Sequence, residues 1–375
     1  MASKPASLPL YQQIYDKLIE DVNEGRLKPG DRLPSENELS QRFDVSRITS
    51  KRALEMLSNE GRVERVPGKG TFLSEAGMQA SGIAAPVSAR VKLIGLVIPQ
   101  FGDEFGATLT RSIEANCREL GYQVVLCLTY ESQKLEEEAI EKLLALGVSG
   151  ILILPVHGEF YNPIILRLVL NKFPLVFVDR RLRGLEASAV SSDNIAAAKA
   201  ATDYLLDKGH RVLGFVSRQI ANSSTLEDRL EGFCRSHIEH GVSIDKSSQI
   251  LERSLDLEMN IEGQTEAEVQ ADLVGIRGLL ENNPDITAVF AAEYSFAVAT
   301  QKAMAELGKN LDIVCFDEPN RPRRLLQKEI AYVQQPELQI GREAVRILRE
   351  LIDGTKSDIE DVRLEASFMQ PYVLD

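Results

Sequence analysis

The chain has 375 residues, of which 44% are hydrophobic, and a formal net charge of −13. This length exceeds what one ordinary hydrophobic core supports and predicts about two or three domains. No apolar run approaches the ~20 residues of a membrane helix and the first residues lack a secretory pattern, so we expect a cytoplasmic protein. The four cysteines are scattered without a CxxC pair, which argues against zinc, and we expect no metal and no cofactor.

The acidic net charge taken alone argues against a nucleic-acid partner, but the charge is unevenly distributed. Residues 1–76 contain twelve basic and twelve acidic residues, whereas the remainder contains 31 basic and 44 acidic ones. Within residues 42–73, seven basic residues stand against four acidic ones. A locally positive segment attached to an acidic body is compatible with DNA binding and limits non-specific adhesion.

The first 73 residues predict a small domain of three helices and a hairpin. Apolar residues recur at every fourth position after Tyr11, which predicts a helix that ends at Gly25. Ser35 and Glu38 form a capping box at the start of a second helix. Ser46 then caps a third helix that reaches to near residue 60.

The third helix and the hairpin that follows it carry residues suited to DNA. Ala53 and Leu57 fall on the apolar side of a helical wheel. Opposite them lies a basic face made of Arg47, Ile48, Lys51 and Arg52. Guanidinium and ammonium groups at the N-terminal front of a helix suit the DNA major groove. Two short strands that begin after residue 61 and return at 71–73 predict a wing, a β-hairpin beside the reading helix.

Four short motifs in this segment resemble the GntR family of winged helix-turn-helix regulators. They are Pro9-Leu10-Tyr11, Pro29-Gly30-Asp31-Arg32-Leu33-Pro34-Ser35-Glu36, Val45-Ser46-Arg47-Ile48-Thr49 and Gly68-Lys69-Gly70-Thr71-Phe72. The resemblance covers residues 9–73 and implies that this part of the chain binds double-stranded operator DNA. The residues implied in DNA binding are Ser35, Glu36, Ser46, Arg47, Thr49, Lys51, Arg52, Gly68 and Lys69.

The expected roles of these residues follow from their side chains. Arg47 can pair bidentately with a guanine, and Lys51 can reach a neighbouring guanine or a phosphate. The hydroxyls of Ser46 and Thr49 would anchor phosphates. Gly68 would let the wing approach the duplex closely, with Lys69 adding charge, although a plain hairpin turn accounts for the glycine equally well.

After residue 73 the composition shifts to Ser, Ala, Gly and Pro, which predicts a flexible linker at residues 74–90. The linker would join a DNA-binding domain of residues 1–73 to a body of residues 91–375. Strand and helix patterns alternate through the body in two series. This order predicts parallel sheets with helices on both faces, arranged as two lobes with a cleft between them. We expect the first lobe at residues 91–192 and 334–352 and the second at residues 193–333 and 353–375.

The body resembles the effector domain of the LacI/GalR family, whose fold is related to periplasmic sugar-binding proteins. The motifs are Val178-Asp179-Arg180, Ser192-Asp193-Asn194, Gly209-His210-Arg211, Arg229-Leu230-Glu231-Gly232-Phe233, Cys315-Phe316-Asp317 and Gln334-Gln335-Pro336. They keep the family's order over residues 91–372. A GntR-type head joined to a LacI-type body is similar to the arabinose repressors of Gram-positive bacteria. The expected fold is an α+β winged helix-turn-helix head followed by an α/β two-lobed body like a periplasmic binding protein.

The second resemblance implies a site for a small effector at the carboxyl ends of the strands, where ligands of such sheets sit. Arg229 and Asp317 lie where related domains hold ligand hydroxyls. Asp103, Phe105, Arg180 and Glu293 are the further candidates. For the two arginines a surface salt bridge is an open alternative, and for Phe105 a place in the core.

The combined resemblance implies a homodimeric, ligand-responsive regulator that represses a carbohydrate operon until a small sugar releases it. Glu293 stands where the family often has asparagine, so a non-sugar effector such as a purine stays open. Because βα architecture hosts many enzymes, an enzyme is the remaining alternative. The chain lacks a GxGxxG motif, a nucleophile elbow and a cluster of metal-ligating residues, so we expect no enzyme.

Overall fold

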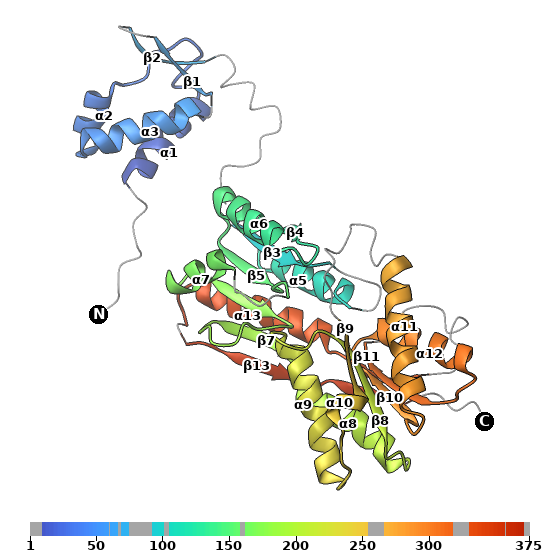
Figure 1. The fold of residues 1–375 in the computed structure, drawn as a ribbon. Coiled ribbons are helices and arrows are strands. Elements are labelled where there is room, and N and C mark those ends of the chain that lie inside the picture. The colour runs from blue at the N-terminus through green and yellow to red at the C-terminus, as the bar shows by residue number, and fades with distance from the viewer. Residues whose placement is uncertain are drawn as a thin grey trace, which may run out of the picture. The chain divides into compact units, whose positions relative to one another are not determined.

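The computed structural model describes residues 10–59, 61–66, 69–74, 92–100, 105–157, 162–253, 266–317, 330–356 and 358–370. The chain divides into two compact units, residues 1–90, here called the head, and residues 91–375, here called the body (Figure 1). Most of the predicted linker, residues 75–90, lies outside the described residues.

The head contains the predicted helices and wing. Its elements are α1 (Leu10–Asn23), α2 (Glu36–Phe43), α3 (Arg47–Asn59), β1 (Val63–Val66) and β2 (Gly70–Leu73). The two strands pair antiparallel, with Val63 opposite Leu73. The capping box is confirmed, because the Glu38 carboxylate accepts from the Ser35 amide at 2.6 Å and the Ser35 hydroxyl accepts from the Glu38 amide at 3.3 Å. Asp44, at φ 50°, then ends α2 in the left-handed conformation that Asp tolerates.

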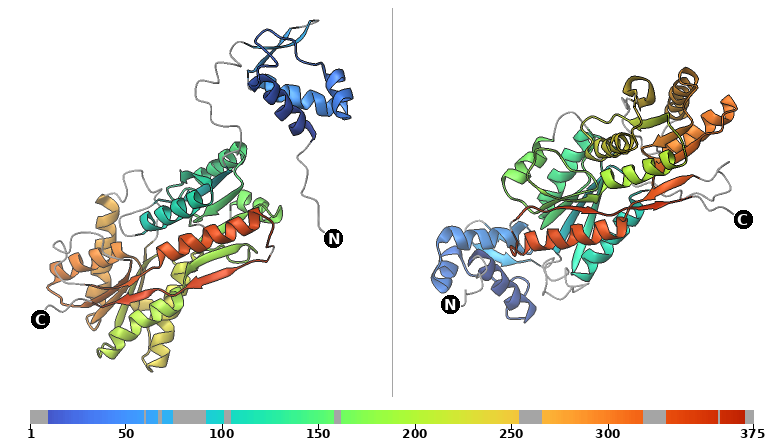
Figure 2. Two further views of the ribbon diagram at one scale, coloured as in Figure 1. Left: turned by 180° about the vertical axis from the view of Figure 1, so that it is seen from behind. Right: turned by 90° about the horizontal axis from the view of Figure 1, so that it is seen from below.

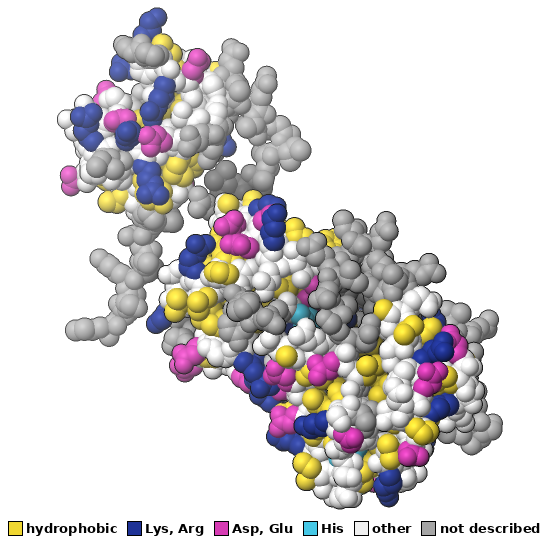
Figure 3. All heavy atoms as spheres, viewed as in Figure 1, with side chains coloured by type: hydrophobic (Ala, Val, Ile, Leu, Met, Phe, Trp, Pro, Cys, Tyr) yellow, Lys and Arg dark blue, Asp and Glu magenta, His cyan; other side chains and the backbone are white. Residues whose placement is uncertain are grey.

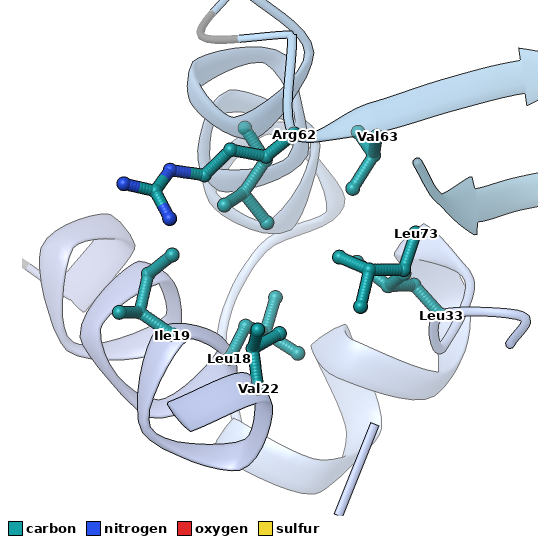
Figure 4. Close-up of a pocket in the computed structure, with 8 residues that line it drawn as sticks. Leu18, Ile19, Val22, Leu33, Arg62, Val63 and Leu73 are labelled. Carbon is teal, nitrogen blue, oxygen red and sulfur yellow. The ribbon is translucent and has the colours of Figure 1, made fainter. Parts of the chain in front are cut away.

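One core holds the head together. Its fully buried members come from all three helices and the wing and include Ile14, Leu18, Leu33, Leu39, Ala53, Leu54, Leu57, Val63 and Leu73. A small hollow remains where α1 meets the start of the wing (Figure 4). Aliphatic side chains line it, with Arg62 at its margin. The hollow is therefore part of the head's core packing.

The first lobe of the body is built on a wholly parallel sheet with the strand order β13-β7-β6-β5-β3-β4. The strands are β3 (Lys92–Ile98), β4 (Tyr122–Leu128), β5 (Gly150–Ile153), β6 (Leu175–Val178), β7 (Ser188–Ser192) and β13 (Asp361–Leu364). Helices α5 (Ala107–Glu119) and α13 (Glu337–Ile352) share one core with one face. Helices α6 (Gln133–Leu146) and α7 (Pro163–Leu170) cover the other face.

The second lobe repeats this plan with the order β14-β12-β11-β10-β8-β9. Its strands are β8 (Leu213–Arg218), β9 (Ile250–Arg253), β10 (Ala288–Ala291), β11 (Asp312–Phe316), β12 (Ala331–Gln334) and β14 (Ser367–Met369), of which only β14 pairs antiparallel among the described strands. Helices α8 (Asn194–Asp207) and α9 (Ser224–Glu239) pack on one face. Helices α11 (Glu266–Asn282) and α12 (Tyr294–Leu307) pack on the other, and the short α10 (Lys246–Gln249) precedes β9.

The expected boundary of the lobes is wrong for the end of the chain. Residues 353–375 were assigned to the second lobe, yet β13 pairs with β7 in the first sheet, and only β14 joins the second. Figure 2 shows this red segment running from one sheet to the other. A four-residue strand carries too little pattern to reveal its sheet, and the backbone edge that β7 leaves open decides its place.

The chain passes between the lobes at three described connections, which follow β7, β12 and β13. These connections lie side by side. The Ser192 hydroxyl donates to the Gln335 side chain at 2.8 Å, and the Asp193 amide donates to the Leu364 carbonyl at 2.7 Å. Among the described residues, none of the helices combines the length and hydropathy that crossing a membrane requires.

Candidate functional sites

The front of α3 has the amphipathic arrangement that the helical wheel predicts. Ala53 and Leu57 are buried in the head's core, and Arg47, Lys51 and Arg52 are exposed. In Figure 3, Lys and Arg side chains on the visible face of the head alternate with Asp and Glu, which fits its balanced charge. The basic side chains of α3 are therefore accessible to a polyanion.

Arg47 is paired with a residue that was also predicted to contact DNA. Its Nη2 lies 3.9 Å from the Glu36 carboxylate, and its side chain is 69% exposed against 30% for Glu36. Lys51 Nζ lies 3.7 Å from Glu55 in the same way. Exposed pairs of this kind contribute roughly 0–1 kcal/mol, so both cations can exchange the carboxylate for DNA. The Glu36 carboxylate can orient Arg47, whereas it would repel a phosphate.

The hydroxyl groups predicted to anchor phosphates form helix caps. The Ser46 hydroxyl accepts from the Thr49 amide at 3.2 Å and lies 2.8 Å from the Thr49 hydroxyl. Ser35 caps α2 in the same manner. Caps hold the free amides of a helix start in place, and those amides are suited to bind phosphate.

The remaining head candidates differ in their surroundings. The Arg52 guanidinium lies 4.4 Å above the Tyr11 ring, which ties it to α1. Gly68 lies outside the described residues, whereas Lys69 is exposed beside the wing turn. Arg32 is not among the predicted DNA-binding residues, yet its side chain packs against the wing. A Cβ added at Gly70 would lie 2.9 Å from the Arg32 Nε.

In the body, charged side chains from both lobes meet between the two sheets. We call this group the interlobe cluster; it consists of Glu131, His157 and Arg180 from the first lobe and Arg218, Ser223 and Glu293 from the second. Most of these residues end or follow strands, as ligand-contacting residues of open α/β sheets do. The sequence predicts Arg180 and Glu293 as site residues but not the other four. The signal for Arg218 was available, because it ends an apolar strand just as Arg180 follows one.

The first-lobe half of the cluster is an ion pair joined to a histidine. Arg180 Nη2 lies 3.1 Å from Glu131 Oε1, and its Nη1 lies 2.6 Å from His157 Nδ1. Burial alone would raise the pKa of Glu131, but the Arg180 charge and the hydrogen bond from Arg180 hold that pKa well below its usual range. The pair is therefore ionised.

His157 is held neutral by its surroundings. Burial and the Arg180 charge both lower the pKa of His157. A guanidinium can only donate, so Nδ1 accepts from Arg180, although Glu131 Oε1 also lies 3.3 Å from that nitrogen. The proton then sits on Nε2, which donates to the Ser223 hydroxyl of the second lobe at 3.1 Å.

The second-lobe half is a matching ion pair. Arg218 Nε donates to Glu293 Oε2 at 2.6 Å, and both side chains are largely buried. Burial opposes ionisation of Glu293, yet the Arg218 charge and hydrogen bond lower its pKa. Each lobe therefore presents one buried Arg–Glu pair.

Arg229 and Asp317 lie together in a more deeply buried layer. The Arg229 side chain is bonded to Asn194 at 2.9 Å and to the Ala292 carbonyl at 2.7 Å, and its guanidinium lies 3.8 Å above the Phe316 ring. Asp317 accepts from Gln335 at 2.6 Å. Burial raises the pKa of Asp317 to about 7, against the Arg229 charge.

This burial decides between alternatives left open by the sequence. With 4% of Arg229 exposed and Arg180 largely buried, neither arginine is a surface salt-bridge partner. Phe105 is partly buried and packs against the core of the first lobe, as its core alternative predicts. Asp103 lies outside the described residues.

Three buried polar atoms at the strand ends have no hydrogen-bond partner among the described residues. They are Thr129 Oγ1 after β4, Asp179 Oδ1 after β6 and Ser217 Oγ in β8. Asp179 has φ 62° and lies within electrostatic reach of Arg229, Arg180 and Glu293. Buried polar groups are normally bonded, so these three atoms keep unused hydrogen-bonding capacity at the carboxyl ends of the strands.

The lobes also touch beside the cluster. The Arg181 amide donates to the Ser224 hydroxyl at 3.0 Å, and Arg183 pairs with Glu227 and Asp228 at 2.9 Å each. These contacts join the loop after β6 to the start of α9. The two lobes are therefore close together at the charged residues.

Comparisons with known proteins agree with this architecture. The model of the gntR family of bacterial regulatory proteins matches residues 10–73, and the model of the periplasmic binding protein domain matches residues 94–356. The arabinose metabolism transcriptional repressor of Geobacillus stearothermophilus is 30% identical over 245 residues, which cover 64% of this chain and 65% of that protein. Its counterpart in Halalkalibacterium halodurans is 30% identical over 238 residues, with 62% and 61% coverage.

The chain thus spans less than two thirds of the length of these two relatives. Among solved structures, the complex of the transcriptional regulator CelR with cellobiose has a TM-score of 0.65 at 22% identity and covers 87% of this chain and 91% of that one. That likeness supports the fold. Since one family model covers well over half of the sequence and the other covers the head, the chain belongs to the periplasmic binding protein domain family and carries a gntR-family helix-turn-helix head.

Proposed function

We propose that this protein is a cytoplasmic transcriptional repressor that binds operator DNA through its head and is released by a small sugar bound between the lobes of its body. The observation that carries the proposal is the interlobe cluster, where charged groups from both sheets converge at the carboxyl ends of the strands. The names of the relatives, repressors of arabinose and ribose operons, support the sugar as effector.

The domain limits of this proposal are a DNA-binding domain at residues 1–73, a linker at residues 74–90 and an effector body at residues 91–375. On the head, Arg47 would read a guanine, with Lys51 and Lys69 contacting DNA nearby. In the body, Arg229, Asp317, Arg180 and Glu293 would surround the effector. We propose no catalytic role.

Dimerisation is part of the proposal because a single head makes few base contacts. Two heads joined by their bodies read half-sites about one helical turn apart. A ligand that bridges both lobes favours the conformation it binds best, and in a dimer this changes the spacing of the heads.

Two measurements test the proposal. First, duplexes selected from a random pool by the purified protein should share a two-fold symmetric sequence, and sedimentation should give one dimer per duplex. Second, a thermal-shift screen against pentoses, hexoses, disaccharides and purines should show stabilisation by a sugar, since a ligand of the native state raises its stability. An unselective DNA pool would refute the regulator, and stabilisation by a purine alone would replace the sugar as effector.

A further inference from the structure

The interlobe cluster has no surplus of positive charge. Both of its arginines are already paired with carboxylates, Arg180 with Glu131 at 3.1 Å and Arg218 with Glu293 at 2.6 Å. His157 is neutral, because its Nδ1 accepts from a guanidinium. The cluster itself therefore sums to zero charge.

The deeper layer of Arg229, Asp179 and Asp317 adds no surplus of positive charge. Arg229 is the third guanidinium, and it lies within electrostatic reach of both Asp179 and Asp317. The Arg229 Nε donates to Asn194, its Nη1 donates to the Ala292 carbonyl, and its guanidinium lies over the Phe316 ring. Among the described residues of the site, the guanidiniums are therefore matched or outnumbered by carboxyl groups.

An anionic ligand would be costly in such a place. Removing a charge from water is strongly unfavourable unless the charge meets an opposite charge. A phosphate group that reaches Arg180 or Arg218 meets a guanidinium that Glu131 or Glu293 already neutralises, and that neighbouring carboxylate repels the added negative charge.

Hydroxyl groups meet no such obstacle. An ionised carboxylate can accept several hydrogen bonds, and Glu293 keeps Oε1 without a hydrogen-bond partner among the described residues while its side chain is 24% exposed. Asp179 Oδ1, which lies within electrostatic reach of Arg180 and Glu293, is a second oxygen without a hydrogen-bond partner among the described residues. A hydroxyl can donate to the Glu293 carboxylate and accept from an arginine, and it adds no second negative charge beside either ion pair.

We infer that the effector is an uncharged polyhydroxyl compound, a free sugar and not its phosphate ester, and that the Arg180–Glu131 and Arg218–Glu293 pairs impose this choice. The inference rests on the proposed function, because it assumes that the site between the lobes holds the effector. The two pairs select against anions by keeping their own arginines neutralised.

The test compares matched ligands on the full chain. Calorimetric titration with D-glucose and glucose 6-phosphate compares one pyranose with and without the charged group. L-Arabinose, D-ribose and ribose 5-phosphate extend the comparison to pentoses. We expect at least one free sugar to bind, and any phosphate ester to bind about tenfold or more weakly than its free sugar. An ester that binds as tightly as its parent overturns this inference and leaves the repressor proposal standing. If no sugar of the thermal-shift screen binds and a purine does, the sugar effector is refuted and this inference with it.

A substitution tests the cause. Glu293→Gln removes the charge that neutralises Arg218, so affinity for the esters should rise about tenfold relative to the free sugars. Glu131→Gln should act likewise through Arg180, and it keeps the test available if the first variant does not fold. The matched control is Glu306→Gln on α12, whose 45% exposed carboxylate pairs with Arg277 on the surface and should change nothing. Unchanged selectivity in both folded site variants would overturn the assignment of the pairs.

Discussion

Replacing a helical glycine by alanine should have opposite effects on stability at two positions of the body. Gly232 in α9 lies against α8, and a Cβ added there would lie 2.3 Å from the Ile195 carbonyl oxygen, 2.8 Å from Ala198 Cβ and 2.9 Å from the Lys199 amide nitrogen. Gly278 in α11 has nothing within 4 Å of the same position. Gly232→Ala must therefore push two helices apart, whereas Gly278→Ala only improves helix propensity.

The magnitudes follow from these contacts. Overpacking a well-packed site costs about 1–3 kcal/mol, and the upper end applies at Gly232 because backbone atoms cannot rotate away. Gly278→Ala should stabilise the body by about 0.5–1 kcal/mol. Differential scanning calorimetry of both variants should then show Tm falling by about 5 °C or more for the first and rising slightly for the second.

The Gly232→Ala substitution should also weaken effector binding. Helix α8 begins with Asn194, which accepts from Arg229 of α9 at 2.9 Å. Separating α8 from α9 disturbs this bond, so Gly232→Ala should also reduce the Tm gain produced by the bound sugar. A Gly232→Ala protein that melts and responds to sugar like the wild type would refute the close packing of the two helices.

Three other perturbations have defined outcomes. Arg47→Ala should cost roughly 1–3 kcal/mol on the selected operator and relax preference at one base pair, whereas Lys69→Ala should weaken binding to operator and scrambled duplex alike. Gel-shift titration on both duplexes separates the two, and equal losses for Arg47→Ala would rule out base reading. The pKa of Asp317 is about 7 in the folded state, which is above its value in the unfolded chain. The folded state therefore binds a proton that the unfolded state has lost, and the free energy of unfolding should fall as the pH rises from the unfolded pKa toward 7. Asp317→Asn should flatten that part of the denaturation profile, and an unchanged slope would contradict the raised pKa. Sugar should lower operator affinity and operator should lower sugar affinity by the same factor, with a coupling of about 1–3 kcal/mol. Titrations of each ligand with and without the other check it, and a sugar affinity that operator leaves unchanged would exclude the coupling.

Features that depend on neighbours in sequence could be predicted. The capping box needs only Ser35 and Glu38 three residues apart, and the structure contains both of its hydrogen bonds. The strands β3, β4, β5, β6, β8, β10 and β11 follow from short apolar runs, because fully buried parallel strands are apolar on both sides. The strands β7, β9, β12, β13 and β14 do not have so clear a pattern and were not predicted. The two family resemblances then fixed the order of the domains.

Features that depend on distant partners could not be predicted. Glu131 and His157 carry no motif, and only the sheet order brings them beside Arg180. Arg229 was found by resemblance, but its burial against Phe316 depends on two strands far along the chain. The roles of these residues toward an effector, and of the α3 residues toward DNA, stay predictions.

The three adjacent connections between the lobes have a consequence for synthesis of the protein. The first lobe begins at β3 but needs α13 and β13, which come only after the second lobe's strand β12. On the ribosome, the lobe that starts first is therefore completed after nearly all of the other has emerged. Until then the face of its sheet that α13 covers stays exposed, and the edge of β7 stays unpaired. A truncation before residue 337 should consequently leave both an apolar face and an open strand edge, the two features that promote aggregation of partly made chains.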